Sequence, residues 1–382
     1  MRVCLISKQF NPGGGGSERY AHALANALAR RGHDVDVFAL GDPESLDDVP
    51  LHRRVSLTFL APRRRPLVPF ETIYYSLLAR RTIDFDTYDV LHGTLMPASP
   101  IALTVRPPST PLIVTSHGTS IGEVRSHKFE LPTDYLKKLV FHPMNVLMDV
   151  ATAPRATRVI AISSVAEREL LRWYPVDEDA LAHVPHGVDT ERYHPDVGQH
   201  PAVCTDQFTL LHVGRLVSRK HVDLALEALA VLERDDVELL IAGTGPHHSR
   251  LATRAEQLGV TARTTFLGFV PDENLPSLYA DSDAVLFLSR YEGFGLTVLE
   301  AMAAGTPVIG TPVGGVPDVV TDGEDGLIVE RDATAVTGAI DRLAETPELT
   351  MEMGAKARAV AEQRTWDSVA AKTENVYQDV LE

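Results

Sequence analysis

Two glutamates, Glu292 and Glu300, stand eight positions apart, and a glycine-rich turn opens the span between them. The turn follows an apolar run, 284–288, that predicts a buried strand, and leads into a segment, 296–304, that predicts a helix. Such a junction presents free backbone N–H groups at the start of a helix, where they can donate to phosphate oxygens. Carboxylates accept hydrogen bonds from sugar hydroxyls. The stretch therefore predicts a site for an anionic or hydroxyl-rich ligand.

Glu300 lies in a predicted helix whose other residues are mostly apolar. A solvent-facing helix position is the simpler interpretation of a single glutamate. A carboxylate among apolar neighbours is costly to bury alone, however, so we expect Glu300 to have a partner.

Two cationic residues, Arg215 and Lys220, follow the first predicted strand of the second half of the chain. An arginine offers a bidentate fork and a lysine a point charge, a pair that suits a diphosphate. The alternative is a solvated charge cluster, and Arg219 fits that interpretation better than the other two.

Two further turns follow predicted strands. Gly243 and Gly245 lie in a glycine turn where a ligand could come close to the backbone. Phe269 and Val270 follow the next strand, and their backbone could read a nucleobase edge. A plain turn is an equally good interpretation of the second segment.

The first half of the chain has its own glycine-rich loop, in which Gly14, Gly15 and Gly16 follow the first predicted strand and open a helix. Glycines allow a ligand to approach and leave N–H groups accessible. The alternative is a flexible turn with Ser17 as the helix cap. The loop is not a P-loop, because no Lys-Ser or Lys-Thr pair follows it.

Histidines also follow strands of the first half. His117 precedes a glycine after the strand at 112–115, where it could donate to a sugar hydroxyl or to developing charge. A structural role is equally compatible with a single histidine. His92 is the weaker candidate, and we expect it to be structural.

These residues must be positioned by an alternation of short apolar strands and helices that runs through nearly the whole chain. Alternation of this kind predicts parallel sheets with helices on both faces, and ligand sites at the carboxyl ends of the strands. Strands are predicted over 3–7, 34–39, 90–92, 112–115, 159–162, 209–213, 238–241, 265–267, 283–288 and 307–310, and helices over 17–30, 71–81, 164–172, 221–232, 248–258, 296–304 and 366–381.

The chain of 382 residues is long enough for two domains. A polar, proline-containing segment at 189–206 separates two alternating blocks and predicts the linker. We therefore expect an α/β protein of two Rossmann-like doubly wound domains, with residues 1–192 as the first and 205–365 as the second. We expect the terminal helix, 366–382, to pack back on the first domain.

Composition excludes several classes of protein. The formal net charge is −16, from 52 acidic and 36 basic residues, which argues against non-specific nucleic-acid binding. No apolar run approaches the ~20 residues that span a membrane, and the first residues do not resemble a signal peptide. Cys4 and Cys204 have no metal-ligand spacing, so we expect no zinc site and a cytosolic location.

One segment could bring the protein to the inner face of the cell membrane as a peripheral protein. Basic residues stand there beside aromatic and aliphatic ones, a combination that can contact an anionic membrane surface. The segment comprises 63–70 with Arg63, Arg64 and Arg65, followed by Tyr74, Tyr75, Leu77, Leu78, Arg80 and Arg81. Lys137, Lys138 and Phe141 would extend such a patch. A solvated loop followed by an ordinary packed helix is an equal alternative.

The motifs taken together resemble the family 4 retaining glycosyltransferases of GT-B fold, in which two Rossmann-like domains face each other across a cleft. The resemblance covers nearly the whole chain and is most specific in the second half. It rests on 214–220, 243–245, 292–301, 305–309 and 314–317, with weaker support from the first glycine loop and from 184–189.

The resemblance implies a role for each of these residues. Arg215 and Lys220 would neutralise the diphosphate of a nucleotide-sugar donor, and Glu300 would accept from its ribose hydroxyls. Glu292, with the backbone N–H groups of 294–296, would hold the donor sugar. The full donor-binding set is Gly14, Gly15, Gly16, Gly243, Gly245, Phe269, Val270, Phe294, Gly295, Leu296 and Glu300, and the catalytic set is His117, Arg215, Lys220 and Glu292.

His117 would contact the sugar near the reacting centre, and the glycine loop would face the diphosphate or the acceptor. The family requires no cofactor and no divalent metal, and Asp281-Ser282-Asp283, which has the spacing of a metal motif, precedes a strand and is better read as a turn. One residue departs from the family pattern, because His186 stands where asparagine is usual.

The function expected from the resemblance is transfer of a sugar, with retained configuration, from a nucleoside-diphosphate sugar such as a UDP-sugar to a lipid, glycan or small-molecule acceptor. A glycosidase pair is disfavoured, because Glu300 is assigned to the ribose. The alternatives are a nucleotide-sugar epimerase or other enzyme of the same fold, and a non-catalytic nucleotide-sugar-binding protein.

Overall fold

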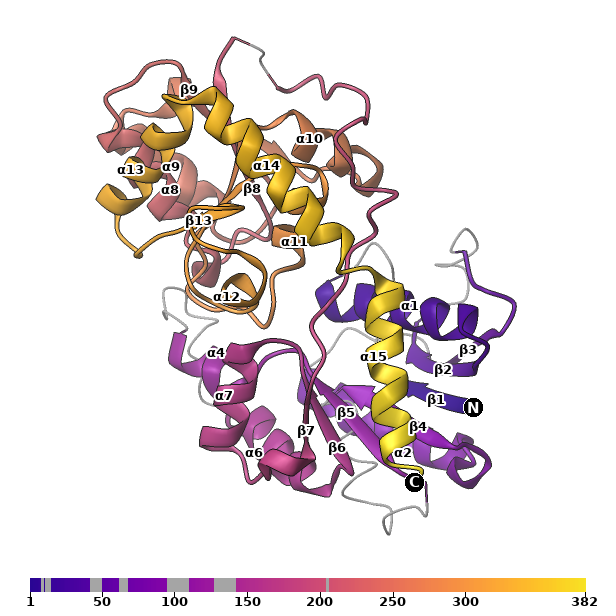
Figure 1. The fold of residues 1–382 in the computed structure, drawn as a ribbon. Helices are drawn as coiled ribbons and strands as arrows, with labels where there is room; N and C mark the ends of the chain where they lie inside the picture. The colour runs from indigo at the N-terminus through magenta and orange to yellow at the C-terminus, as the bar shows by residue number, and fades with distance from the viewer. Residues whose placement is uncertain are drawn as a thin grey trace. The chain divides into compact units, whose positions relative to one another are not determined.

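The computed structural model of the protein describes residues 1–7, 10, 15–41, 50–61, 68–94, 110–126, 142–203 and 206–382, without the side chains of 68–73, 76 and 94. The chain divides into two compact units (Figure 1). Unit 1 comprises Met1–Arg125, Phe129–His186 and Trp366–Glu382, and unit 2 comprises Ser126–Lys128 and Gly187–Thr365.

Unit 1 is built on a parallel sheet in the order β3-β2-β1-β4-β5-β6-β7. Helices cover both of its faces. The strands are β1 (Arg2–Ile6), β2 (Asp34–Leu40), β3 (Val55–Ala61), β4 (Val90–Thr94), β5 (Leu112–Ser116), β6 (Arg158–Ala161) and β7 (Leu181–His183). The helices are α1 (Gly16–Arg30), α2 (Val68–Thr82), α4 (Ser120–Ser126), α6 (His142–Thr152), α7 (Ser164–Trp173) and α15 (Trp366–Asp379), with short 3-10 helices η2 (Phe85–Thr87), η4 (Ala153–Arg155) and η5 (Glu178–Ala180).

Burial on both faces explains why the strands of unit 1 read as continuous apolar runs. On β1, Val3 and Leu5 pack with α1 and α15, whereas Cys4 and Ile6 pack on the opposite face with α2 and α7. Successive side chains of a strand point to opposite faces, so a parallel sheet covered on both sides needs an apolar residue at every position.

Unit 2 repeats this architecture with a parallel sheet in the order β10-β9-β8-β11-β12-β13. Its strands are β8 (Phe208–Val213), β9 (Val237–Ala242), β10 (Thr264–Gly268), β11 (Ala284–Phe287), β12 (Val308–Gly310) and β13 (Gly326–Ile328). Its helices are α8 (Val222–Val231), α9 (His248–Leu258), α10 (Leu275–Asp281), α11 (Leu296–Ala303), α12 (Val316–Val319), α13 (Ala333–Ala344) and α14 (Pro347–Glu362), with 3-10 helices η6 (Ser218–Lys220), η7 (Thr261–Arg263) and η8 (Asp272–Asn274).

The α/β class and the two doubly wound parallel sheets predicted from the sequence are confirmed. Three strands were not predicted, β3, β7 and β13, and each lies at the edge of its sheet. Asp281 and Ser282 end α10, and Asp283 precedes β11, where its Oδ2 accepts a hydrogen bond from the Thr209 backbone N–H at 2.7 Å. The segment is therefore the end of a helix and the approach to a strand, where the sequence predicted a turn.

The C-terminal helix α15 belongs to unit 1 and lies beside α1 (Figure 1). Its Tyr377 hydroxyl lies 2.6 Å from Nδ1 of His92 on β4, and Nε2 of His92 lies 2.7 Å from the Thr115 hydroxyl. All three side chains are buried. His92 therefore has a structural role, as expected, because it links the last helix to the centre of the sheet.

None of the helices in the described part of the chain is long and apolar enough to span a membrane. Of the predicted membrane patch, the basic residues at 63–65 and 137–138 and Phe141 lie outside the described residues, whereas Arg80 and Arg81 on α2 are exposed. Tyr75 is buried in the core of unit 1 and is not available to a membrane surface. On α2, Tyr74 and Leu77 are exposed.

Replacement of Tyr377 by phenylalanine should destabilise unit 1. The change leaves a ring nitrogen of buried His92 without its partner, and such a loss typically costs about 1–3 kcal/mol of the free energy of unfolding. Urea unfolding followed by circular dichroism measures it. Tyr74→Phe, at an exposed tyrosine of the same unit, is the control. Equal stability of the two variants would show that the hydrogen bond between Tyr377 and His92 does not stabilise the unit.

Candidate functional site

The candidate site of unit 2 lies where the order of strands changes direction, between β8 and β11. Ligands of doubly wound sheets bind at this point, outside the carboxyl ends of the strands. β8 is followed by the segment 214–220, which ends in η6, and β11 is followed by 288–295, which leads into α11. The two segments singled out from the sequence therefore follow neighbouring strands at one edge of one sheet.

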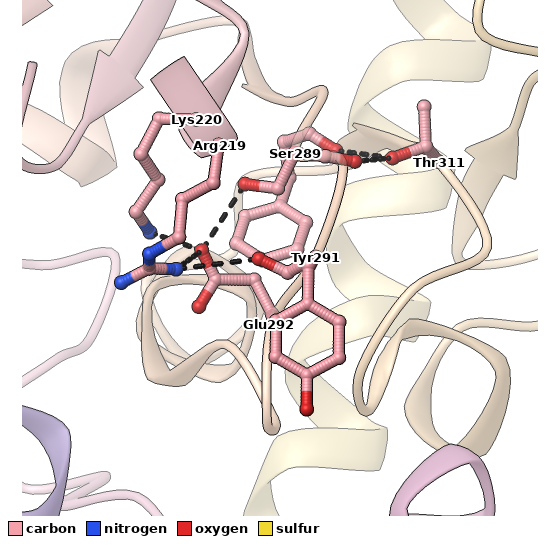
Figure 2. A network of polar contacts seen from close by, with 7 residues as sticks. Arg219, Lys220, Ser289, Tyr291, Glu292 and Thr311 are labelled. Atoms are coloured by element: carbon pink, nitrogen blue, oxygen red, sulfur yellow. Dashed lines mark hydrogen bonds and ion pairs between the residues drawn. The ribbon is translucent and has the colours of Figure 1, made fainter. Parts of the chain in front are cut away.

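A buried carboxylate joins the two segments (Figure 2). Oε1 of Glu292 accepts from Nη1 of Arg219 at 2.6 Å and from the Lys220 ammonium at 2.7 Å. The Ser289 hydroxyl donates to the same oxygen at 3.2 Å. One carboxylate oxygen thus holds two cations, and both cations come from η6.

The environment of Arg219 differs from the one predicted from the sequence. The sequence favoured Arg219 as a solvated charge and Arg215 as the partner of Lys220. In the structure Arg219 pairs with Glu292, whereas the side chain of Arg215 is exposed. The prediction for Arg219 was wrong because its partner is distant in the sequence and is brought near only by the pairing of β8 with β11.

The charges around Glu292 determine its protonation state. Burial by itself would raise the pKa of this carboxyl, but the charges of Lys220 and Arg219, together with their hydrogen bonds, outweigh burial and lower the pKa to about 2. Glu292 is therefore ionised at any physiological pH. It can accept hydrogen bonds but cannot supply a proton.

Backbone contacts hold the two segments in register. The Arg290 backbone N–H donates to the Arg219 carbonyl at 2.7 Å, and Nη1 of Arg290 donates to the Ser218 carbonyl at the same distance. The Thr311 hydroxyl donates to the Ser289 carbonyl at 2.8 Å (Figure 2). The positions of Arg219 and Lys220 relative to Glu292 are therefore fixed by the main chain as well as by charge.

Gly243 is required by contact with the protein's own backbone. A Cβ atom at this position would lie 1.9 Å from the Gly214 carbonyl oxygen, and φ is 146°. Gly245 likewise lies against the Leu216 carbonyl. The close approach that the sequence assigned to a ligand is thus made by the segment that carries Arg219 and Lys220, which packs directly on the glycine turn.

Gly295 ends the turn and begins α11 with a positive φ of 101°. A Cβ atom there would lie 2.5 Å from Cζ of Phe287, and the same ring lies 5.5 Å from the Lys220 ammonium. Phe294 is buried, and its carbonyl accepts from the Gly315 N–H at 2.7 Å. Leu296 is the first residue of α11, where backbone N–H groups have no partner within the helix.

Glu300 has the partner that its apolar surroundings predicted. It is buried on α11, and its Oε2 accepts from the Tyr279 hydroxyl at 3.0 Å. Phe269, in contrast, is 74% exposed after β10, and Val270 is half-buried.

The candidate residues of unit 1 lie after β1 and β5. Gly15 is the N-cap of α1 and Gly16 its first residue, whereas Gly14 lies outside the described residues. The N-cap of α1 is therefore Gly15, and the alternative prediction that Ser17 caps this helix is wrong. His117 follows β5, with its ring 4.7 Å from the ring of Tyr20 between centroids.

Burial lowers the pKa of His117 to about 4, so its imidazole is neutral near pH 7. Within the described part of the chain, neither ring nitrogen has a hydrogen-bond partner. A neutral imidazole has one N–H to donate, which matches the expected contact with a sugar hydroxyl. His186, the departure from the family pattern, is buried and stacks on Tyr20 with ring centroids 5.0 Å apart.

Replacement of Gly295 by alanine should be more damaging than replacement of Gly259. Both glycines have positive φ, which disfavours alanine by about 1–2 kcal/mol. A Cβ atom at Gly259 meets nothing within 4 Å, whereas one at Gly295 must displace the Phe287 ring, and such overpacking costs about 1–3 kcal/mol more. Urea unfolding of the two variants compares them directly, and equal losses would rule out the steric argument.

Known proteins share this architecture. A family model described as Glycosyltransferase Family 4 matches residues 14–192, and one described as Glycosyl transferases group 1 matches residues 199–360. A D-inositol 3-phosphate glycosyltransferase of Corynebacterium diphtheriae is 27% identical, over 99% of this chain and 95% of the relative.

Two solved structures show the same fold. Sucrose-phosphate synthase from Thermosynechococcus elongatus has a TM-score of 0.84 at 22% identity, over 99% of this chain and 98% of the other. The Anabaena protein HepE, in complex with UDP and glucose, has a TM-score of 0.75 at 20% identity, over 100% and 99% of the two chains. The two family models together span most of the sequence, and the chain therefore belongs to the family 4 glycosyltransferases of GT-B fold.

Proposed function

We propose that this glycosyltransferase moves a sugar from a nucleoside-diphosphate sugar to an acceptor hydroxyl with retention of configuration. The observation that carries the proposal is the cluster of Glu292, Arg219 and Lys220 at the carboxyl ends of β8 and β11. Two positive charges and one negative charge leave the cluster with a net charge of +1, which attracts an anionic ligand.

The Lys220 ammonium is the group proposed to bind the diphosphate. It has three N–H donors, and the structure shows one of them used by Glu292. Its side chain is only 11% exposed, so the interaction is weakly screened by water. The exposed Arg215 is proposed as a second contact. The structure of HepE with UDP and glucose, which has the same fold, supports this class of donor.

The remaining residues are assigned by what their side chains can do. Glu292 is proposed to accept from hydroxyls of the donor sugar, Glu300 from the ribose, and neutral His117 to donate to the sugar. The backbone turns at 294–296 and at 268–270 are proposed to contact the phosphates and the base. The acceptor, a lipid-linked, glycan or small-molecule alcohol, is assigned to unit 1.

In the proposed reaction the bond between the anomeric carbon and the diphosphate oxygen breaks, and the acceptor oxygen bonds to the same face of that carbon. The proton of the acceptor hydroxyl passes to the departing diphosphate. Lys220 and Arg215 stabilise the charge that develops on the leaving group. Glu292 is a poor candidate for a nucleophile, because two cations occupy Oε1 and lower its pKa. We propose that no divalent metal takes part.

The donor is identified by a thermal-shift panel of UDP-, GDP- and ADP-sugars in the presence of EDTA. A donor at 100 times its dissociation constant should stabilise the folded protein by about 2.7 kcal/mol and raise its melting temperature. Retained anomeric configuration of the product, followed by NMR, then separates the transferase from an epimerase and from a binding protein. Absence of any shift and of any donor turnover would contradict the proposal.

Lys220→Ala and Arg215→Ala should each raise the activation barrier by about 2–4 kcal/mol, by analogy with the loss of one oxyanion donor. Steady-state kinetics with the preferred donor measure the change in kcat/KM. Lys356→Ala on α14 removes an exposed lysine paired with Glu352 and is the matched control. Turnover of the Lys220 variant within a factor of two of wild type would remove Lys220 from the site.

A further inference from the structure

We propose that Arg219 is a positioning residue, which fixes Glu292 through Oε1 so that Oε2 faces the donor sugar and the Lys220 ammonium stays available to the diphosphate. The proposal rests on the function proposed above. It adds a residue that the sequence placed outside the site.

The contacts of Glu292 divide between its two oxygens. Arg219, Lys220 and Ser289 all bind Oε1. Of the two carboxylate oxygens of Glu292 in Figure 2, only Oε1 is reached by dashed lines, and Oε2 has no hydrogen-bond partner in the described part of the chain. A ligand hydroxyl can therefore use Oε2 without displacing any contact of Oε1.

Arg219 makes hydrogen bonds beyond the one to Glu292. Besides Oε1 of Glu292, its Nη1 contacts the Tyr291 carbonyl at 3.3 Å, and its own carbonyl accepts from the Arg290 N–H at 2.7 Å. These bonds connect Arg219 to the two residues that precede Glu292 in the 288–295 segment. Because a guanidinium donates in a rigid plane, it can fix the direction of a carboxylate, whereas a lysine supplies a point charge.

The charge of Arg219 also sets the net charge of the cluster that it forms with Glu292 and Lys220. Without Arg219, Glu292 and Lys220 would form a neutral pair, and the lysine charge would be fully balanced before a ligand arrives. With Arg219 present, one positive charge remains. The Glu292 and Lys220 side chains are 10% and 11% exposed, so water does little to replace a lost partner.

Two other ionisable side chains of the described residues lie beside the cluster, and neither takes over this role. His212 on β8 lies close enough to Lys220 and Glu292 to interact with both, but burial, followed by the charge of Lys220, lowers its pKa to about 4. It is therefore neutral near pH 7. The guanidinium of Arg290 donates instead to the Ser218 carbonyl.

A double-mutant cycle tests whether Arg219 acts through Glu292. The variants are Arg219→Gln, Glu292→Gln and the pair, with kcat and donor KM measured for each. Arg219→Gln should lower kcat/KM for the donor about tenfold or more in wild type, and about twofold or less when Glu292 is already glutamine. Multiplicative losses would show that Arg219 acts independently of Glu292 and would overturn the proposal, as would unchanged kinetics of the single variant.

The pH profile is a second readout. Loss of Arg219 should raise the pKa of Glu292, because one of the two cations that lower it is gone. The pH below which kcat/KM falls should therefore be higher in Arg219→Gln than in wild type. In Arg219→Lys, which restores a positive charge, this pH should return toward the wild-type value. An unchanged pH in Arg219→Gln would overturn the proposal.

A stability measurement makes the test independent of activity. Glu292 has a depressed pKa, so its ionisation stabilises the fold above its ordinary pKa of about 4.5, and this stability is lost as the pH falls toward 2. In Arg219→Gln the folded-state pKa should lie nearer its ordinary value, so the loss should be smaller and should end at a higher pH than in wild type, as measured by urea unfolding between pH 3 and pH 7. A curve parallel to that of wild type counts against the proposal, even if a variant is inactive.

Arg254→Gln is the matched control for both measurements. Arg254 on α9 pairs with Glu227 at 2.8 Å in unit 2, and both side chains are 37% exposed. Its replacement should leave the kinetics and the pH profile unchanged. Wild type that neither turns over nor binds any donor of the panel would refute the proposed function, whereas an active wild type with multiplicative losses would refute only the role of Arg219.

Discussion

The burial of the Glu292 carboxylate is the constraint on which the site depends. A buried charge is tolerated only with partners, and here both partners are cations of η6. The η6 segment and the turn after β11 must therefore lie in contact, and the main-chain bonds of Arg290 reinforce the same arrangement. The result is a carboxylate, which accepts hydrogen bonds, held beside a net positive charge.

The sheet and its glycines make this contact possible. β8 and β11 are neighbours where the strand order changes direction, so the segments that follow them emerge side by side. Gly243 and Gly245 allow the 214–220 segment to lie directly against the next turn, and Gly295 allows α11 to begin beside Phe287. Several glycines that suggest contact with a ligand thus serve first to pack one loop of the protein on another.

The central elements were predictable, because strands buried on both faces are apolar throughout and their boundaries show in the sequence. The missed strands are edge strands. Residues of β3 are half-exposed or exposed, and β7 and β13 are three residues long, so neither apolar pattern nor length distinguishes them from loops. Gly14 and the basic residues at 63–65 and 137–138 of the membrane patch fall outside the described residues and stay predictions. The partner of Glu300 was expected, but its identity as Tyr279 was not.

By itself the sequence determined the fold class, the family and the types of side chain that the site would contain. These depend on local patterns: apolar runs, glycine turns and charged residues just after strands. Only the tertiary structure decided which charges meet. Arg219 and Glu292 are 73 residues apart, and no local pattern distinguishes Arg219 from the neighbouring exposed Arg215. The pairing follows from the adjacency of β8 and β11, because electrostatic partners are set by distance in space.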